Sequence, residues 1–349
     1  MTERLRVVVA TPVPDDVVEL LTSAEPRIDL VHEPSLLPTM RHPADHGGDP
    51  DFSRTPEQQR RFEELLDSAD ALYGVPDSDS AALARTAGAN DKLRWVHTMA
   101  AGGGAQVKGA NLSPEQLERI TFTTSAGVHA QPLTEFALFG LLAGAKTLHR
   151  LSENQHRHEW DDRWMMGQLS QQTVLVVGLG GIGRRVAEVL AAVGATVIGT
   201  SRRGASVPGV DRVIHPDELA AVAGEVDGVV STLPGTDATQ GLLGADFFAA
   251  LKRGATVVNV GRGPVIDEDE LVAALRSGAV GFAALDVFSI EPLPGDSPLW
   301  DMPNVLVSPH TAALSTAEDR LIAEVFVANA TRLLDDEELV NVVDTVEFY

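Results

Sequence analysis

The chain has 349 residues, 44% of them hydrophobic, which is more than one hydrophobic core usually holds, so we expect two domains. The formal net charge of -23 argues against a nucleic-acid partner, because a polyanion would be repelled without a strong basic patch, and the sequence has no such run. There is no cysteine, which excludes disulfides, thiolate nucleophiles and zinc sites with cysteine ligands.

The N-terminus does not have the pattern of a targeting signal. Charged residues lead from Met1 directly into the strand-like segment 7–9, which is not the pattern of a secretory signal. The longest apolar stretch, 136–145, is shorter than the roughly 20 residues that a membrane helix needs. We therefore expect a cytoplasmic protein with no membrane partner.

Short apolar runs alternate with helical patterns in the first part of the chain, which is typical of parallel sheets covered by helices. The predicted strands are 5–10, 28–32, 71–75, 93–98 and 121–124. Between the second and third strands, the stretch from Pro34 to Pro56 is rich in proline, glycine, aspartate and histidine. A loop of this length is unusual inside a compact domain. A surface insertion is the favoured interpretation, and a flap over an active site is the alternative.

A second series of strands is predicted at 174–177, 196–199, 228–232, 255–260, 281–287 and 305–307. One helix, 133–151, precedes this series. Another helix, 316–334, follows it without a strand partner, and we infer that it returns to the first domain. The predicted fold class is α/β, with two doubly wound parallel-sheet domains, Rossmann-like or flavodoxin-like, and a cleft between them.

A glycine-rich turn follows the first strand of the second series, in Val174-Leu-Val-Val-Gly178-Leu-Gly180-Gly-Ile-Gly183. Gly178 permits the tight turn, Gly180 lets the backbone approach a pyrophosphate, and Gly183 allows the next helix to pack closely. The N-terminus of that helix offers free N–H groups to an anion. The pattern predicts a dinucleotide site, although enzymes that use S-adenosylmethionine have similar turns.

The end of the second strand of this series distinguishes between cofactors. NAD sites usually have an acidic residue about 20 positions after the turn, where it binds the ribose 2′-hydroxyl. This chain has Thr200-Ser201-Arg202-Arg203 there, with no carboxylate and two guanidinium groups that suit a 2′-phosphate. The sequence therefore favours NADP(H), with NAD(H) possible. The alternative is that Arg202 and Arg203 are solvated loop residues.

Three charged residues follow in order, each near the C-terminal end of a predicted strand, where ligands bind in open α/β sheets. Arg262 lies between two glycines, Glu291 precedes a proline that restricts its backbone, and His310 ends the last strand. Each residue alone could be structural. Together they suit proton-coupled hydride transfer.

In this interpretation, His310 takes the hydroxyl proton in oxidation and returns it in reduction. Glu291 orients the imidazole through its other ring nitrogen. Arg262 binds the substrate carboxylate beside the oxygen that gains charge. A nicotinamide supplies the hydride, so no metal is expected, and the histidine-rich segment 149–159 lacks the spacing of a zinc helix.

The stretch from Gly178 to His310 resembles the D-isomer-specific 2-hydroxyacid dehydrogenase family. The motifs that carry the resemblance are the glycine turn, Ser231-Thr-Leu-Pro-Gly-Thr, Asn259-Val-Gly-Arg262-Gly, Asp286-Val-Phe with Glu291-Pro, and Ser308-Pro-His310. The N-terminal third is more weakly similar, through Leu93-Arg-Trp-Val-His-Thr-Met-Ala-Ala-Gly102-Gly103. Ser201 replaces the acidic residue of NAD-using members, and in this the chain resembles the NADPH-dependent glyoxylate/hydroxypyruvate reductase branch.

The resemblance implies a discontinuous substrate domain of residues 1–125 and 312–349, a Rossmann domain of residues 126–311, and a homodimer formed through the latter. It also implies that backbone amides of the loop at Ala101, Gly102 and Gly103 bind the substrate carboxylate. Asp286 would hold the nicotinamide carboxamide. The expected cofactor contacts are Gly178, Gly180, Gly181, Ile182, Gly183, Ser201, Arg202, Arg203, Leu233, Pro234, Val260, Gly261 and Asp286.

We therefore expect hydride transfer between NADP(H) or NAD(H) and a small 2-oxo or D-2-hydroxy acid such as glyoxylate, hydroxypyruvate or pyruvate. A non-catalytic, dinucleotide-sensing protein of the corepressor kind is the main alternative, and the intact set of Arg262, Glu291 and His310 argues against it. A formate or phosphite dehydrogenase is a third possibility, and the former has a glutamine where this chain has Glu291. The glycine-rich loop 101–104 leaves the substrate open.

Overall fold

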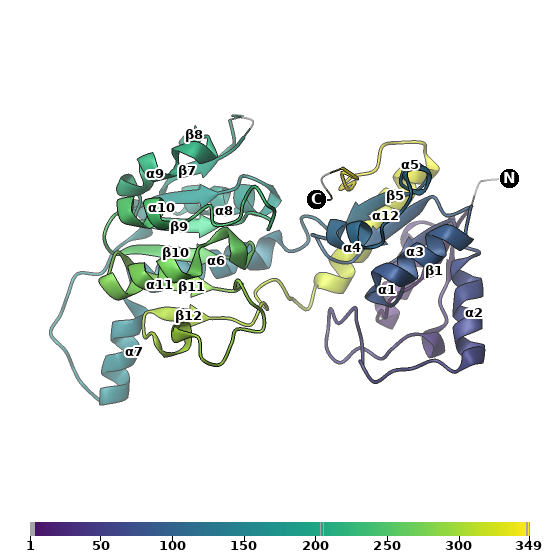
Figure 1. Ribbon diagram of the computed structural model, residues 1–349, viewed down its shortest axis with the longest axis horizontal. Coiled ribbons are helices and arrows are strands. Elements are labelled where there is room, and N and C mark those ends of the chain that lie inside the picture. The colour runs from purple at the N-terminus through teal and green to yellow at the C-terminus, as the bar shows by residue number, and fades with distance from the viewer. Residues whose placement is uncertain (1–3, 203, 205, 347, 349) are drawn as a thin grey trace. The chain divides into compact units, whose positions relative to one another are not determined.

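The structure is a computed structural model that describes residues 4–202, 204, 206–346 and 348 (Figure 1). The chain forms two compact units, the first made of residues 1–129 with 314–349 and the second of residues 130–313. Each unit is built on one parallel sheet with helices between its strands. The predicted fold class, two parallel-sheet α/β domains, is therefore confirmed. Among the described residues, no helix is both long and apolar enough to cross a bilayer.

Unit 1 has a five-stranded sheet in the order β2-β1-β3-β4-β5. Its strands are β1 (Leu5–Val9), β2 (Ile28–Val31), β3 (Ala71–Tyr73), β4 (Trp95–Thr98) and β5 (Thr121–Thr124). Its helices are α1 (Asp15–Ala24), α2 (Pro56–Leu66), α3 (Ser80–Ala89), α4 (Gly104–Gly109), α5 (Pro114–Arg119) and α12 (Glu318–Leu334), with the short 3-10 helices η1 (Pro34–Leu36) and η2 (Pro76–Ser78). The order 2-1-3-4-5 is that of flavodoxin-like sheets.

Aromatic packing places the last helix in unit 1. The ring of Phe326, on α12, stacks on Trp95 of β4 with 4.3 Å between ring centroids. Tyr73 of β3 meets the same ring edge-on at 4.9 Å. All three side chains are buried. Because large aromatic side chains bury much apolar area, this contact holds the C-terminal helix to the N-terminal sheet.

Unit 2 has a seven-stranded sheet in the order β12-β11-β10-β9-β6-β7-β8. Its strands are β6 (Thr173–Val177), β7 (Thr196–Thr200), β8 (Arg212–Ile214), β9 (Gly228–Ser231), β10 (Ala255–Asn259), β11 (Val280–Leu285) and β12 (Val305–Val307). Its helices are α6 (Ala130–Ala145), α7 (Leu148–Arg157), α8 (Gly181–Ala192), α9 (Leu219–Val222), α10 (Ala245–Ala250) and α11 (Glu268–Ser277). The 3-10 helices are η3 (Leu169–Gln171), η4 (Pro216–Glu218), η5 (Ala223–Glu225), η6 (Gly263–Val265) and η7 (Pro298–Asp301).

Two expectations for unit 2 were wrong. The helix predicted at 133–151 is two helices, because Thr147 adopts a left-handed backbone with φ 52° and ends the regular hydrogen bonding between α6 and α7. The sheet has one strand more than predicted, β8, which has only three residues and begins at the exposed Arg212. With only two apolar residues, Val213 and Ile214, this strand leaves an apolar run too short to be recognised in the sequence.

The stretch from Pro34 to Pro56 is attached to unit 1 by buried contacts. Leu36, Ala44 and Asp45 within it are buried. The backbone N–H of Ala44 donates to Asp319 Oδ2 on α12 at 3.0 Å, and Thr11 Oγ1 donates to the carbonyl of His46 at 2.6 Å. The insertion is thus packed onto the unit at its middle as well as at its two ends.

A largely buried group of charged and polar side chains joins this insertion to α12. Glu318 Oε1, at the start of α12, lies 3.1 Å from His129 Nε2 and 3.6 Å from His46 Nε2. Asp319 Oδ1 lies 3.8 Å from His46 Nδ1. Burial opposes the ionisation of Glu318, but the neighbouring imidazoles of His129 and His46 outweigh it and lower the pKa of Glu318 to about 2.

The first testable prediction concerns this ionised carboxylate. Because the pKa of Glu318 is lowered from 4.5 to about 2, its charge stabilises the fold above pH 4.5, and this contribution is lost as the pH falls toward 2. We expect Glu318→Gln to lower the free energy of unfolding by about 3 kcal/mol at pH 7 and by about 1 kcal/mol at pH 3. Urea unfolding at both pH values measures the difference.

Glu324→Gln is the matched control, because Glu324 lies on the same helix in an exposed pair with Arg320. Its effect should stay within about 0.5 kcal/mol. An equal effect of the two variants, or a loss in Glu318→Gln that does not depend on pH, would contradict the interpretation.

Candidate active site

The glycine turn joins β6 to α8 and is shaped by two of its glycines. Gly178 has φ 103°, a left-handed conformation that other residues rarely adopt. A Cβ atom on Gly183 would lie 1.8 Å from the carbonyl oxygen of Gly178, so only glycine fits this contact. The hydroxyl of Thr200, at the end of β7, accepts the Gly178 N–H at 2.8 Å and fixes the turn against the neighbouring strand.

The first turn of α8 is open to a ligand. The helix begins at Gly181, and no side chain of its N-cap residue, Gly180, is present to cap it. A Cβ atom on Gly180 or Gly181 would meet no atom within 4 Å. Ile182 and Gly183 follow in the same turn. Uncapped N–H groups at a helix N-terminus bind anions, so this turn fits the pyrophosphate of a dinucleotide.

The segment after β7 begins with Ser201 and Arg202, two of the residues expected to contact the ribose of the cofactor. The N–H of Ser201 donates to the carbonyl of Ile214 on β8 at 3.0 Å, which extends the pairing of the two strands by one residue. Arg202 follows it directly. Arg203, the second arginine expected here, lies outside the described residues.

Residues after β9 and β10 lie beside the glycine turn. Thr232 Oγ1 donates to the carbonyl of Gly178 at 2.7 Å, and the side chain of Leu233 packs against the same glycine. A Cβ atom on Gly261 would lie 2.5 Å from the carbonyl oxygen of Leu233. The segments with Leu233 and Pro234 and with Val260 and Gly261 are therefore neighbours at one edge of the sheet.

Arg262 is held by its backbone at the end of β10. Asn259 brackets it, because Asn259 Nδ2 donates to the Arg262 carbonyl at 3.1 Å and Asn259 Oδ1 accepts the N–H of Gly261 at 3.1 Å. A Cβ atom on Gly263 would lie 1.9 Å from the carbonyl group of Phe288. This close approach brings the Arg262 segment against the segment that contains Glu291.

Glu291 and His310 form a hydrogen-bonded pair. His310 Nδ1 lies 2.7 Å from Glu291 Oε2, while Glu291 Oε1 accepts the N–H of Phe288 at 3.0 Å. Because an ionised carboxylate only accepts hydrogen bonds, Nδ1 carries the proton and Nε2 is the nitrogen left for a ligand. The two side chains are 44% and 35% exposed, so the imidazole is anchored and still accessible.

The electrostatics of this pair favour an ionised carboxylate. Burial opposes the ionisation of Glu291, but the hydrogen bonds from His310 and Phe288 and the charges of His310 and Arg262 outweigh it. The pKa of Glu291 is therefore below its ordinary value. The charge of Arg262 thus acts on the same carboxylate that anchors His310.

Asp286 lies directly after β11 and is 1% exposed. Its carbonyl accepts the N–H of His310 at 2.9 Å. The described structure thus brings Arg262, Glu291, His310 and Asp286 to the same edge of the seven-stranded sheet, as the strand order predicts.

The predicted substrate loop belongs to unit 1. Ala101 and Gly102 lie between β4 and α4, and Gly103 is the N-cap of α4. A Cβ atom on Gly103 would lie 1.8 Å from Thr98 Oγ1, so the close packing of this loop on β4 requires a glycine there.

Several supporting residues were not predicted as site residues. Thr200, Thr232 and Asn259 all hydrogen-bond backbone groups of the glycine turn or of the Arg262 segment. Their position in the sequence could have indicated this role, because each of them is a polar residue at the end of a predicted strand or directly after it.

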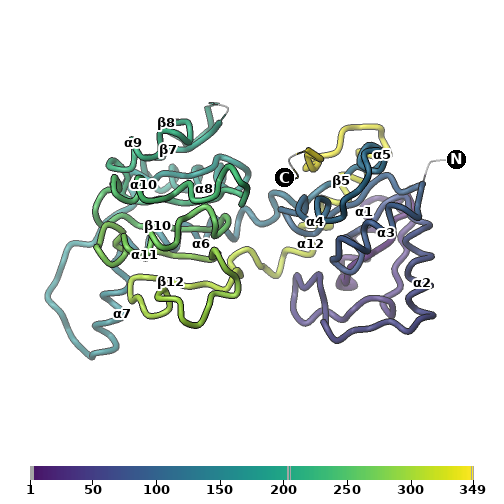
Figure 2. The backbone as a smooth tube through the Cα atoms, viewed as in Figure 1, coloured from purple at the N-terminus to yellow at the C-terminus, as the bar shows by residue number. Residues whose placement is uncertain are grey.

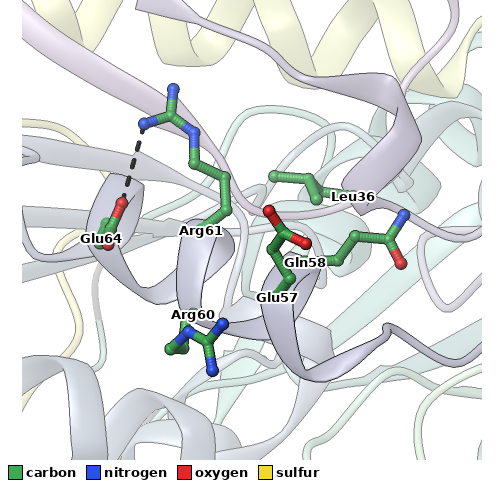
Figure 3. A pocket seen from close by; sticks show the side chains of 6 residues that line it. All are labelled: Leu36, Glu57, Gln58, Arg60, Arg61 and Glu64. Carbon is green, nitrogen blue, oxygen red and sulfur yellow. Dashed lines mark ion pairs between the residues drawn. The ribbon is translucent and has the colours of Figure 1, made fainter.

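None of the predicted site residues lines the hollow shown in Figure 3. It has a volume of about 470 Å³, lies on α2 and η1 of unit 1, and is lined by Leu36, Glu57, Gln58, Arg60, Arg61 and Glu64. Arg61 pairs with Glu64 at 3.9 Å and with Glu33 at 2.5 Å. Because Arg61 is neutralised by neighbouring carboxylates, we assign this hollow no function.

Comparison with known sequences identifies a family and relatives of this chain. Residues 138–312 match the family described as D-isomer specific 2-hydroxyacid dehydrogenase, NAD binding domain. An uncharacterized protein of Corynebacterium melassecola is 33% identical over 265 residues, which cover 74% of this chain and 84% of that protein. A glyoxylate/hydroxypyruvate reductase A of Salmonella dublin is 30% identical over 266 residues, 75% of this chain and 83% of the relative.

Solved structures are similar over nearly the whole chain. A D-isomer specific 2-hydroxyacid dehydrogenase from Xanthobacter autotrophicus Py2, in complex with NADPH and MES, has a TM-score of 0.78 and 30% identity and covers 99% of this chain and 100% of its own. An NADPH-dependent glyoxylate/hydroxypyruvate reductase from Sinorhizobium meliloti, in complex with NADP and sulfate, has a TM-score of 0.77 and 27% identity with the same coverage.

The second prediction follows from the packing of the glycine turn. Gly183→Ala places a methyl group against the Gly178 carbonyl, so we expect the free energy of unfolding to fall by more than about 3 kcal/mol. Gly181→Ala, two residues earlier, places its methyl group in open space and should change the free energy of unfolding by less than about 1 kcal/mol. Thermal unfolding of both variants measures this, and a Gly183→Ala protein as stable as Gly181→Ala would refute the packing argument.

Proposed function

Because the chain belongs to the D-isomer-specific 2-hydroxyacid dehydrogenase family, we propose that it is an NADPH-dependent reductase of small 2-oxo acids in which His310 donates the proton. The observation that carries the proposal is the 2.7 Å hydrogen bond between His310 Nδ1 and Glu291 Oε2, beside a guanidinium group that acts on the same carboxylate. The family consists of oxidoreductases, and the proposal extends to the roles of single residues.

His310 acts as general acid in reduction and as general base in oxidation. Glu291 holds Nδ1, so the proton is transferred at Nε2, to the carbonyl oxygen in one direction and from the hydroxyl group in the other. Neither residue forms a bond to carbon, so no covalent intermediate is needed.

Arg262 binds the substrate carboxylate and polarises the carbonyl group. One guanidinium nitrogen donates to the Gly261 carbonyl at 2.8 Å, which fixes the side chain. Among the described residues the remaining guanidinium N–H groups have no acceptor. A planar guanidinium meets a carboxylate with two parallel hydrogen bonds, and its charge stabilises the oxygen that becomes an alkoxide.

The residues of the glycine turn fit a dinucleotide. Gly180, Gly181 and Ile182 offer N–H groups to the pyrophosphate, Leu233 and Pro234 flank the turn with Val260 and Gly261, and Asp286 binds the nicotinamide carboxamide. When bound, the reduced nicotinamide supplies the hydride. The lack of a carboxylate at Ser201 and the presence of Arg202 support NADPH over NADH, as do the NADPH and NADP in the similar structures.

We propose a short 2-oxo acid as the substrate. The relatives named glyoxylate/hydroxypyruvate reductases support small substrates of this class. In unit 1, the loop of Ala101, Gly102 and Gly103 would bind the substrate carboxylate through backbone amides. Gly103 is buried and its N–H donates to the carbonyl of Ala100 at 3.2 Å, so the amides of Ala101 and Gly102 carry this part of the proposal.

We also propose a homodimer formed through unit 2. The segment between α7 and β6 runs away from the sheet of its own unit (Figure 2). Trp160 and Met165 on it are 100% and 96% exposed. Exposed large apolar side chains on one projecting segment mark an interaction surface, and a second copy of the chain is the partner that this family suggests.

The direct test of function is the initial rate of oxidation of NADPH and of NADH with glyoxylate, hydroxypyruvate and pyruvate. We expect turnover with NADPH and at least one of these acids, with the D-enantiomer as product where the product is chiral. Binding of NADPH without turnover would favour a non-catalytic, dinucleotide-sensing protein.

The third prediction concerns the proton donor. His310→Ala should lower kcat by a factor on the order of 1,000, because proton transfer is lost, while the dissociation constant of NADPH changes little. His215→Ala is the control, since His215 is an exposed histidine of the same unit. Near-normal turnover in His310→Ala would show that His310 is not the proton donor.

The fourth prediction concerns the 2′-phosphate. Arg202→Ala, alone and together with Arg203→Ala, should raise the KM for NADPH at least about tenfold and leave the KM for NADH nearly unchanged, because only the former carries the phosphate. Equal changes in both constants would show that these arginines do not distinguish the two cofactors.

A further inference from the structure

One oxygen of Asp286 holds the segment that carries His310. Asp286 Oδ1 accepts three hydrogen bonds, from Ser308 Oγ at 2.5 Å, from the Thr311 N–H at 2.9 Å and from the Ala312 N–H at 3.0 Å. The three donors lie on both sides of His310 in the chain. Hydrogen bonds to an ionised acceptor are stronger than those between neutral groups, so this contact is the main polar anchor of residues 308–312.

The backbone of His310 requires such an anchor. Its φ is 54°, a left-handed conformation that costs a residue with a Cβ atom about 1–2 kcal/mol. The His310 N–H also donates to the Asp286 carbonyl at 2.9 Å. Asp286 therefore binds the segment at four points and keeps the histidine in a conformation that it would otherwise leave.

The second carboxylate oxygen of Asp286 has a different role. Within the described part of the chain, Oδ2 accepts no hydrogen bond. Ser308, which is 8% exposed, donates to Oδ1 at 2.5 Å and thereby restricts the rotation of the carboxylate. As a result, one oxygen serves the His310 segment and the other stays available to a ligand.

We propose that Ser308, acting through Asp286, is a positioning residue for His310. This inference rests on the proposed function of His310 as proton donor. The Ser308 hydroxyl fixes the carboxylate, the carboxylate fixes residues 308–312, and the segment holds Nδ1 of His310 within hydrogen-bond distance of Glu291. The same carboxylate is the proposed contact of the nicotinamide carboxamide, so cofactor binding at Oδ2 and the orientation of the proton donor depend on one side chain.

The experiment compares Ser308→Ala with Ser308→Thr, which keeps the hydroxyl, and with Ser308→Val, which has the shape of threonine without it. Ser277→Ala is the control, because this variant also loses one hydroxyl hydrogen bond, the one from Ser277 Oγ to the Ala274 carbonyl at the end of α11 in the same unit. Three quantities are measured: kcat and KM, the dissociation constant of NADPH by fluorescence, and the tautomer of His310 by 15N NMR at a pH where the ring is neutral.

We expect the neutral ring of His310 to carry its proton on Nδ1 in the wild-type protein, in Ser308→Thr and in Ser277→Ala. In Ser308→Ala and Ser308→Val, the Nε2–H tautomer should become populated and kcat should fall about tenfold, while KM and the dissociation constant of NADPH change less than about threefold. A purely structural role would lower stability without changing the tautomer.

An unchanged tautomer and an unchanged kcat in Ser308→Ala would overturn the inference. If Ser308→Ala does not fold, Asp286→Asn replaces it, because asparagine keeps the shape and weakens the acceptor. It should populate the Nε2–H tautomer as well, and failure to do so overturns the inference. If the wild-type protein shows no turnover, the proposed function fails, and the NMR comparison still decides whether Ser308 positions the imidazole.

Discussion

The hydrogen bond between His310 Nδ1 and Glu291 Oε2 is the interaction on which the rest of the site depends. It places a ring proton on Nδ1 and leaves Nε2 as the nitrogen available to a ligand. Glu291 lies on the segment that follows β11, and His310 lies on the segment that follows β12, in the seven-stranded sheet. The packing of Gly263 against Phe288 and the attachment of residues 308–312 to Asp286 bring these segments together. The distance between the two side chains is therefore set by how these segments pack at the edge of the sheet.

A strongly acidic protein has to bind anionic ligands through local features. The net charge of -23 opposes the approach of a dinucleotide and of a 2-oxo acid. In the proposed function, groups that act at short range compensate for this charge: the uncapped N-terminus of α8 would bind the pyrophosphate, Arg202 the ribose phosphate and Arg262 the substrate carboxylate. Contacts at such short range are screened by salt less than the general field of the protein is.

Most of the sheet architecture could be predicted from the sequence, because buried parallel strands leave apolar runs and close packing requires glycine at fixed positions. The strands at 121–124 and 305–307 were predicted with their observed bounds, and Gly183 stands where no other residue fits. The break at Thr147 was not predicted, since a left-handed residue does not interrupt the apolar pattern. The role of Ser308 could not be predicted either, because its partner lies 22 residues earlier and meets it only through the pairing of β11 with β12.

The most direct test of the central claim is kcat for reduction in the wild-type protein and in Glu291→Gln, together with the tautomer of the neutral His310 ring by 15N NMR. If the carboxylate holds Nδ1 of the ring, the variant should populate the Nε2–H tautomer and lose kcat by a factor on the order of 100, because the ring no longer presents Nε2 for proton transfer. An unchanged tautomer together with an unchanged kcat would show that Glu291 does not orient the proton donor.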